Sequence, residues 1–234
     1  PSNYTVELYA VIGNQRYDLD SVTIETIDVV APTVVMLTPE NQSYFNGQST
    51  LVSVEATDVD SGIDEVLVQV DDQSWQKTMA TSIGYQLSIA NLTDGSHNIR
   101  AKAIDRSGLE NETAWIDFTV DSIAPDVSIE NVANDAFYST DVTPLVNITD
   151  TNLARSYVTI NNVAYGNEAI VEEGNYTLIA SGEDLAGNSS IASISFTVDK
   201  TAPVIEIDGV EDGAIYTDAR QVVSAIDANI DRTD

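Results

Sequence analysis

A short stretch ending in Ala-Pro occurs three times in this chain and divides it into segments. The copies end at Pro32, Pro125 and Pro203, and each lies between two runs in which apolar and polar residues alternate. Alternation with a period of two predicts half-buried strands. Proline cannot donate a ladder hydrogen bond, so it belongs at the start of a strand and not in its middle. Each copy therefore predicts the last strand of one β module, a short linker and the first strand of the next.

The spacing of these prolines sets the sizes of the modules. Pro125 follows Pro32 by 93 residues, and Pro203 follows Pro125 by 78 residues, which is enough for a small β-sandwich in each interval. We therefore predict an all-β chain of four segments. Residues 1–30 supply the last strands of one module, residues 31–123 and 124–201 are complete modules, and residues 202–234 supply the first strands of another.

The composition narrows the possible partners. The chain has 38 acidic residues against 9 Lys and Arg, a formal net charge of -29, which argues against binding nucleic acid through its phosphates. Such acidity suits divalent cations, a saline habitat or both. The chain has no cysteine, so metal ions are the expected staple for small secreted modules. No stretch is long and apolar enough to be a membrane span.

Several short motifs recur at matching places in the modules. They are Ala-Thr-Asp-x-x-Ser-Gly at residues 56–62, Asp-Gly-x-His-x-Ile at 94–99, Asp-x-Ala-Gly-Asn at 184–188 and Val-Asp-Lys-Thr-Ala-Pro at 198–203. Together they resemble the tandem immunoglobulin-like repeats of prokaryotic cell-surface proteins, which occur in adhesins, stalk proteins and S-layer glycoproteins. The resemblance implies immunoglobulin-like β-sandwiches in an elongated array, located outside the cell on its surface or in its envelope.

In a sandwich of this kind, the second and penultimate strands end at the pole where the first strand begins, so acidic residues should gather there. Oxygen ligands without cysteine, and with a single histidine in the chain, favour Ca²⁺. The bland alternative is that each Asp only caps its own turn. The expected ligands are Asp28, Asp58, Asp60 and Asp105 at the first pole, Asp121, Asp150, Asn152 and Asp184 at the second, and Asp199, Asp227 and Asn229 at the third. The first pole, as the most acidic, is the best expected ligand set.

Sequons for N-glycosylation form a second signal. An Asn-x-Ser/Thr sequence predicts a surface position in a secreted chain. The alternative is that Asn, Ser and Thr are simply frequent in turn-rich β proteins. The sequons begin at Asn3, Asn41, Asn91, Asn111, Asn147, Asn175 and Asn188. Modification of several of them would favour an archaeal or similar envelope over a typical bacterial adhesin.

The candidate catalytic and sugar-binding residues have structural interpretations. His97 is the single histidine and aligns with Tyr176, at the place where a tyrosine corner packs its ring and bonds back to the backbone. Trp75 and Trp115 are interpreted as core residues, with a sugar-binding platform as the alternative. No glycine-rich phosphate loop or helix-borne metal motif is present. We therefore predict that this segment is not an enzyme.

These observations favour a non-enzymatic structural protein of the cell surface, such as a stalk, filament or S-layer element stiffened by Ca²⁺ between modules. Its partners would be copies of itself or other envelope proteins, and surface glycans are a further possibility. One alternative is an adhesin that binds glycans or proteins. Another is a set of accessory modules of a secreted hydrolase, whose catalytic domain would lie outside this stretch.

Overall fold

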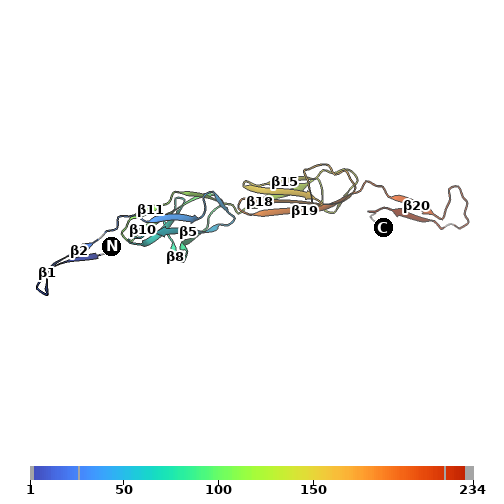
Figure 1. Cartoon of the computed structure of the whole chain (residues 1–234). Helices are drawn as coiled ribbons and strands as arrows, with labels where there is room; N and C mark the ends of the chain where they lie inside the picture. Colours follow the sequence, from blue (N-terminus) through green and yellow to red (C-terminus); the bar gives the residue numbers. More distant parts are fainter. Residues whose placement is uncertain (1–2, 26, 219, 230–234) are drawn as a thin grey trace. The chain divides into compact units, whose positions relative to one another are not determined.

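The computed structural model describes residues 3–25, 27–218 and 220–229. Every regular element in these ranges is a β-strand (Figure 1), which confirms the all-β prediction. No helix in the described part of the chain is long and apolar enough to cross a membrane. Contacts divide the chain into two units with their boundary between Ile123 and Ala124.

The first unit opens with a hairpin and continues into a two-layered sandwich. Strands β1 (Asn3–Ile12) and β2 (Gln15–Glu25) form the hairpin, with Ile12 opposite Gln15. One layer of the sandwich has the strand order β3 (Thr33–Thr38), β5 (Ser49–Thr57), β9 (Gly84–Ala90) and β8 (Met79–Thr81). The other layer has the order β4 (Ser43–Phe45), β12 (Ile116–Val120), β10 (Gly95–Asp105), β6 (Ile63–Val70) and β7 (Gln76–Lys77), and β11 (Glu110–Glu112) also pairs with β10.

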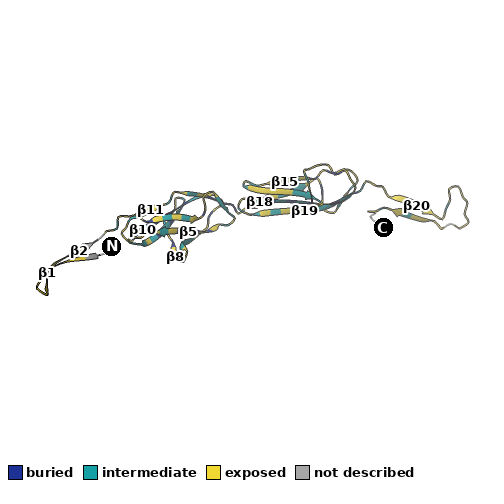
Figure 2. Cartoon of the chain, in the orientation of Figure 1, coloured by how far each residue is buried: buried dark blue, intermediate teal, exposed yellow. Residues whose placement is uncertain are grey.

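Alternation along the strands produces the first core. On β10, burial alternates from Ile99 to Asp105, because successive side chains of a strand point to opposite faces. Figure 2 shows exposed and partly buried stretches along the strands of the sandwich. The ring of Phe118 is 1% exposed and meets Phe45 edge to face, with ring centroids 5.9 Å apart. The buried core residues are Val52, Val54, Val66, Val68, Val70, Ile89, Leu92, Ile99, Ala101, Ala103, Phe118 and Val120.

The second unit contains a smaller sandwich. One layer is the antiparallel pair β13 (Asp126–Glu130) and β15 (Leu145–Thr149). The other has the order β14 (Ala136–Tyr138), β19 (Ser189–Val198), β18 (Gly174–Asp184), β16 (Leu153–Ile160) and β17 (Val163–Ala164). Its buried core residues are Val132, Val142, Ile170, Leu178, Phe196 and Val198. Beyond this sandwich, β20 (Val204–Asp208) pairs with β21 (Val222–Ile226).

Both sandwiches exchange their first strand between layers. In the first sandwich β3 pairs with β5 in one sheet, and β4 then crosses to the other sheet and pairs in parallel with β12, with Ser43 opposite Phe118. In the second, β14 pairs in parallel with β19, with Ala136 opposite Phe196. The short parallel strand covers the edge of the sheet that would otherwise stay unpaired.

The two tryptophans lie outside the core, so their interpretation as core residues was wrong. Trp115 is 43% exposed, and Trp75 is only partly buried. The guanidinium of Arg100 lies over both rings, 4.9 Å from the centroid of Trp75 and 4.5 Å from that of Trp115. Arg100 also donates to Gln69 and to Glu112. Cation–π contacts therefore hold the tryptophans against the outer face of the first sandwich.

Candidate metal centre

The turn between β5 and β6 holds Asp58 at one pole of the first sandwich. The backbone amides of Asp60, Ser61 and Gly62 all donate to Asp58 Oδ1, at 3.1, 2.8 and 2.8 Å. These bonds, led by that from Gly62, lower the pKa of Asp58 below its ordinary value of 3.8, because they stabilise the carboxylate. Asp58 is therefore held as an anion by one of its two oxygens.

Asp105 ends β10 at the same pole and is almost completely buried, with 1% of its surface exposed. Burial opposes the charge on its carboxylate, but hydrogen bonds from Ser107, Leu109 and Gly108 outweigh burial and lower the pKa. The Ser107 hydroxyl and the Leu109 amide donate to Oδ1 at 2.7 and 2.9 Å. Oδ2 is buried and has no hydrogen-bond partner among the described residues.

Asp28 reaches the same place from the linker that precedes β3. Its Oδ1 accepts a hydrogen bond from the Val30 amide at 3.0 Å, and its Oδ2 is buried with no hydrogen-bond partner among the described residues. Close by, the Asn111 side chain donates to the Pro32 carbonyl at 2.9 Å. The linker is thus bonded to the sandwich at the point where its carboxylate is delivered.

These three carboxylates form one cluster. Asp28, Asp58 and Asp105 each offer an oxygen, and the three oxygens lie within 4.8 Å of one another. Three anions at such distances repel one another unless a cation lies between them. A buried carboxylate oxygen without a partner also costs the full desolvation of a charged group. The cluster therefore has both the charge and the free oxygens that a cation requires.

Asp60 does not join this cluster. Its side chain is exposed, and its described contribution is the backbone amide that it donates to Asp58. The metal cluster and the capping of turns by Asp are therefore compatible. Oδ1 of Asp28 and of Asp105 accepts amide hydrogen bonds from its own turn, and Oδ2 of each has no hydrogen-bond partner among the described residues.

The second sandwich repeats the loops with one difference. The Asn152 amide donates to Asp150 Oδ1 at 2.6 Å, and the Asn188 amide donates to Asp184 Oδ1 at 2.8 Å. Oxygens of Asp150 and Asp184 lie within 4.8 Å of each other. Here, however, Asp184 Oδ2 accepts a hydrogen bond from Asn188 Nδ2 at 2.7 Å.

The linker aspartates repeat one local geometry. In each copy Oδ1 accepts a bond from the amide two residues on: Val30 to Asp28, Ile123 to Asp121 and Thr201 to Asp199, at 3.0, 3.1 and 3.1 Å. In the third group, the Asn229 amide donates to Asp227, and Asn229 Nδ2 donates to Asp199 Oδ2 at 2.7 Å. The linker residue Asp199 therefore contacts the loop after β21, as Asp28 lies close to Asp58 in the loop after β5.

Comparison with known proteins identifies the fold. Residues 32–101 match the family model of the bacterial Ig domain. Among solved structures, the ICAM-5 D1-D4 ectodomain fragment aligns with a TM-score of 0.51 and 11% identity, covering 97% of this chain and 75% of that chain. The two sandwiches are immunoglobulin-like domains. This confirms the resemblance predicted from the motifs.

Other comparisons add no functional information. The fibronectin(III)-like modules of Clostridium thermocellum CbhA align with a TM-score of 0.46 and 17% identity, covering 71% of this chain and 94% of that chain. Comparison with the curated proteins gives no match. At these identities the similarity concerns the fold alone, and a fold of this type carries many unrelated functions.

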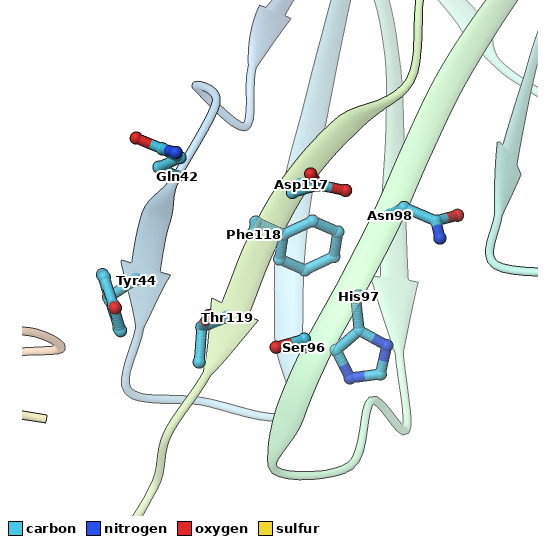
Figure 3. Close-up of a pocket in the computed structure, with 8 residues that line it drawn as sticks. All are labelled: Gln42, Tyr44, Ser96, His97, Asn98, Asp117, Phe118 and Thr119. Atoms are coloured by element: carbon cyan, nitrogen blue, oxygen red, sulfur yellow. The ribbon is translucent and has the colours of Figure 1, made fainter. Parts of the chain in front are cut away.

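At the start of β10, His97 occupies the corner position of the first immunoglobulin-like domain (Figure 3). Its Nε2 lies 2.7 Å from the Thr93 carbonyl, four residues upstream, and its ring stacks on Phe118. In the second domain the Tyr176 hydroxyl donates to the Glu172 carbonyl at 2.8 Å, also four residues upstream. The structural interpretation of His97 is thus confirmed.

The same end of β10 carries a pocket of ≈ 620 Å³, at the opposite end of the strand from Asp105 (Figure 3). Asn98 lines it, and the side-chain oxygen of Asn98 is buried and lacks a hydrogen-bond partner among the described residues. The lining residues are Gln42, Tyr44, Ser96, His97, Asn98, Asp117, Phe118 and Thr119.

The sequons differ in how open their side chains are. Asn91 and Asn147 are exposed. By contrast, Asn111 Nδ2 donates to Pro32, and Asn188 Nδ2 donates to Asp184. Asn41 accepts from the Asp117 amide, and Asn175 accepts from the Thr197 hydroxyl. The side chain of Asn3 lies outside the described residues.

Proposed function

We propose that this chain is a non-enzymatic structural element of a prokaryotic cell surface, such as a stalk, filament or S-layer component, in which Ca²⁺ fixes linkers to immunoglobulin-like domains. The observation that carries the proposal is the buried Oδ2 of Asp105, which has no hydrogen-bond partner among the described residues and belongs to a cluster in which oxygens of Asp28, Asp58 and Asp105 lie within 4.8 Å of one another. Two of these carboxylates belong to the domain, and the third belongs to the linker. One ion bound by all three would remove freedom of the linker.

The chemistry of the ligands selects the ion. All three are carboxylates, and Ca²⁺ takes six to eight oxygens with flexible geometry. Carbonyl oxygens of the linker and water would complete the shell. The absence of cysteine from the chain removes the thiolates that softer metals prefer.

The proposal extends to the other poles by equivalence in sequence and local geometry. Asp121 and Asp199 stand before Ala-Pro as Asp28 does, and they make the same turn. Asp150 with Asp184, and Asp227 with Asn229, supply the strand-end residues in the repeats. Asp60 and Asn152 stay predictions as ligands. Each donates its backbone amide to the aspartate two residues before it.

Thermal unfolding with Ca²⁺ and with a chelator, at constant high NaCl, tests this function. A ligand that binds only the folded state stabilises it by about 2.7 kcal/mol at one hundred times its Kd. We expect Ca²⁺ to raise the Tm of the first domain and Asp105→Asn to abolish the increase. Asp72→Asn is the matched control, since its exposed carboxylate follows the far end of β6 and lies outside the cluster. Equal melting with and without Ca²⁺ would leave salt adaptation as the explanation of the acidity.

Exposed apolar residues support protein partners, which we propose are copies of this chain or other envelope proteins. In the first domain, Met79 on the edge strand β8 is 75% exposed, and unpaired strand edges favour strand addition. Sizing of the purified chain at high concentration tests this, and a strictly monomeric species would contradict it. Hydrolytic activity of the chain would contradict the non-enzymatic function.

Glycosylation is proposed at the open sequons of this surface protein. Asn91 and Asn147 present exposed amides, so we expect them to carry glycan before Asn111 or Asn188, whose amides are engaged. Peptide mass spectrometry of the natively expressed protein measures the occupancy. Unmodified Asn91 and Asn147 would contradict the proposal.

A second candidate function is glycan binding by an adhesin, favoured by the polar pocket beside His97. Its lining offers the polar side chains of Asn98 and Asp117 to sugar hydroxyls, and Tyr44 offers a ring for contact. A glycan array tests this function. Binding that is lost in Asn98→Ala would support it, and no binding would leave the structural function alone.

A further inference from the structure

One position separates the buried aspartates of the two domains. The loop after Asp105 and the loop after Asp184 have the same backbone bonds: the aspartate amide donates to the carbonyl of Leu109 or Asn188, at 3.0 Å in both cases. In return, the amides of Leu109 and Asn188 donate to Oδ1, at 2.9 and 2.8 Å. The fourth residue after the aspartate is therefore equivalent in the two domains and differs only in its side chain.

The side chain at position 109 or 188 decides whether Oδ2 of the aspartate accepts a hydrogen bond. Asn188 Nδ2 donates to Asp184 Oδ2 at 2.7 Å. Leucine has no donor to offer, and Asp105 Oδ2 is left buried without a hydrogen-bond partner among the described residues. An amide N–H bears partial positive charge, so Asn188 supplies in part what a cation supplies at the other pole. A cation that uses Asp184 Oδ2 must first displace this hydrogen bond.

We propose that the residue at position 109 or 188 sets the cation affinity of each pole, so that the first domain binds Ca²⁺ tightly and the second binds it weakly. This inference rests on the proposed binding of Ca²⁺ at the aspartate poles. Its consequence is graded occupancy: as Ca²⁺ falls, the second pole empties first and Asn188 keeps its aspartate satisfied.

Calorimetric titration of the 234-residue chain with CaCl₂ tests the inference. Among the binding steps of the wild type, Asp105→Asn should remove a tight one and Asp184→Asn should remove a weaker one. Leu109→Asn should weaken the tight step by about tenfold or more, because a hydrogen bond to a charged group must then be broken. Asn188→Leu should strengthen the weak step by a similar factor.

Matched controls separate the amide from the change in shape. Leu109→Ala removes the leucine without adding a donor, so it should leave the tight step nearly unchanged. Asn188→Ala should strengthen the weak step as Asn188→Leu does. Circular dichroism at saturating Ca²⁺ shows that each variant is folded before its affinity is compared.

The outcomes distinguish this inference from the proposed function. A wild-type chain that binds no Ca²⁺ overturns both. Binding that depends on Asp105 but is unchanged by Leu109→Asn overturns the inference and leaves the proposed function intact. A tight step that depends on Asp184 instead of Asp105 also overturns the inference.

Discussion

The two immunoglobulin-like domains share their loop hydrogen bonds and differ in what fills the equivalent positions. The first has a core of 12 buried residues between two sheets of several strands, and the second has six, with one sheet reduced to a pair. The first uses His97 at its corner, and the second uses Tyr176. The repeated aspartates thus give the two domains the same loop geometry. The residues that differ between them, such as His97 and Tyr176, should give the domains different stability and a different dependence on pH.

The largest expected difference comes from the two core phenylalanines. Phe118 and Phe196 are 1% and 2% exposed, and truncation of such a residue to Ala costs about 3–5 kcal/mol. We expect Phe196→Ala to unfold the second domain, because its smaller core provides less stability in total. Phe118→Ala should lower the free energy of unfolding of the first domain without unfolding it. Both tryptophans of the chain, Trp75 and Trp115, lie in the first domain. Denaturation followed by tryptophan fluorescence therefore measures the first domain, and far-UV circular dichroism measures both. A fluorescence transition shifted by Phe196→Ala would show that the domains unfold as one.

A smaller effect is expected on the outer face of the first domain. Arg100 contacts both tryptophan rings, and the position equivalent to it in the second domain is Ile179. Exposed cation–π contacts contribute about 0.5–1 kcal/mol each, so Arg100→Ala should lower the free energy of unfolding of the first domain by about 1–2 kcal/mol. Lys77→Ala, which breaks only an exposed pair with Glu65, is the control and should change little. Equal effects of the two substitutions in denaturant titrations would show that the ring contacts contribute nothing.

The corner of the second domain should contribute about as much as one hydrogen bond. Tyr176→Phe removes the donor to the Glu172 carbonyl and keeps the ring, which stacks on Phe196 with centroids 5.6 Å apart. The expected loss is about 1 kcal/mol, measured by circular dichroism on the second transition. An unchanged transition would mean that water replaces the hydroxyl at no cost.

The smallest effect is a pH dependence confined to the first domain. His97 faces two acceptors, Asp71 Oδ2 at 2.9 Å and the Thr93 carbonyl at 2.7 Å, and a neutral imidazole can donate to only one of them. Burial lowers the pKa of His97, but the bonds to Thr93 and Asp71 outweigh burial and raise it above 6.5. The stabilisation is therefore complete below pH 6.5 and is lost as pH rises through the raised pKa. Fluorescence-detected denaturation from pH 6 to 9 should show this slope, and His97→Tyr should remove it. The same slope in the variant would contradict this assignment.

The sequence could predict the strands, the linkers and the aspartates that gather at the first pole. Alternation specifies which face of a strand is buried, and the topology of the sandwich then places Asp58 and Asp105 together. The sequence could not show which carboxylate oxygen stays bare, because that depends on which oxygen the amides of the turn reach. The prediction that Trp75 and Trp115 are core residues was wrong, because it rested on their size alone. Arg100 on the outer face contacts both rings, and the sequence does not show this contact.

The short parallel strands have a mechanical consequence. Because β4 lies near the beginning of the first domain and β12 at its end, and they run in the same direction, tension on the two ends of the domain slides these strands past each other. Their hydrogen bonds are then loaded together and must break at once, instead of opening one after another. The pair β14–β19 gives the second domain the same resistance to shear. Stretching single molecules in the presence of a chelator should give a lower rupture force after Asp121→Pro, which removes the amide that donates to the Phe45 carbonyl at 2.9 Å.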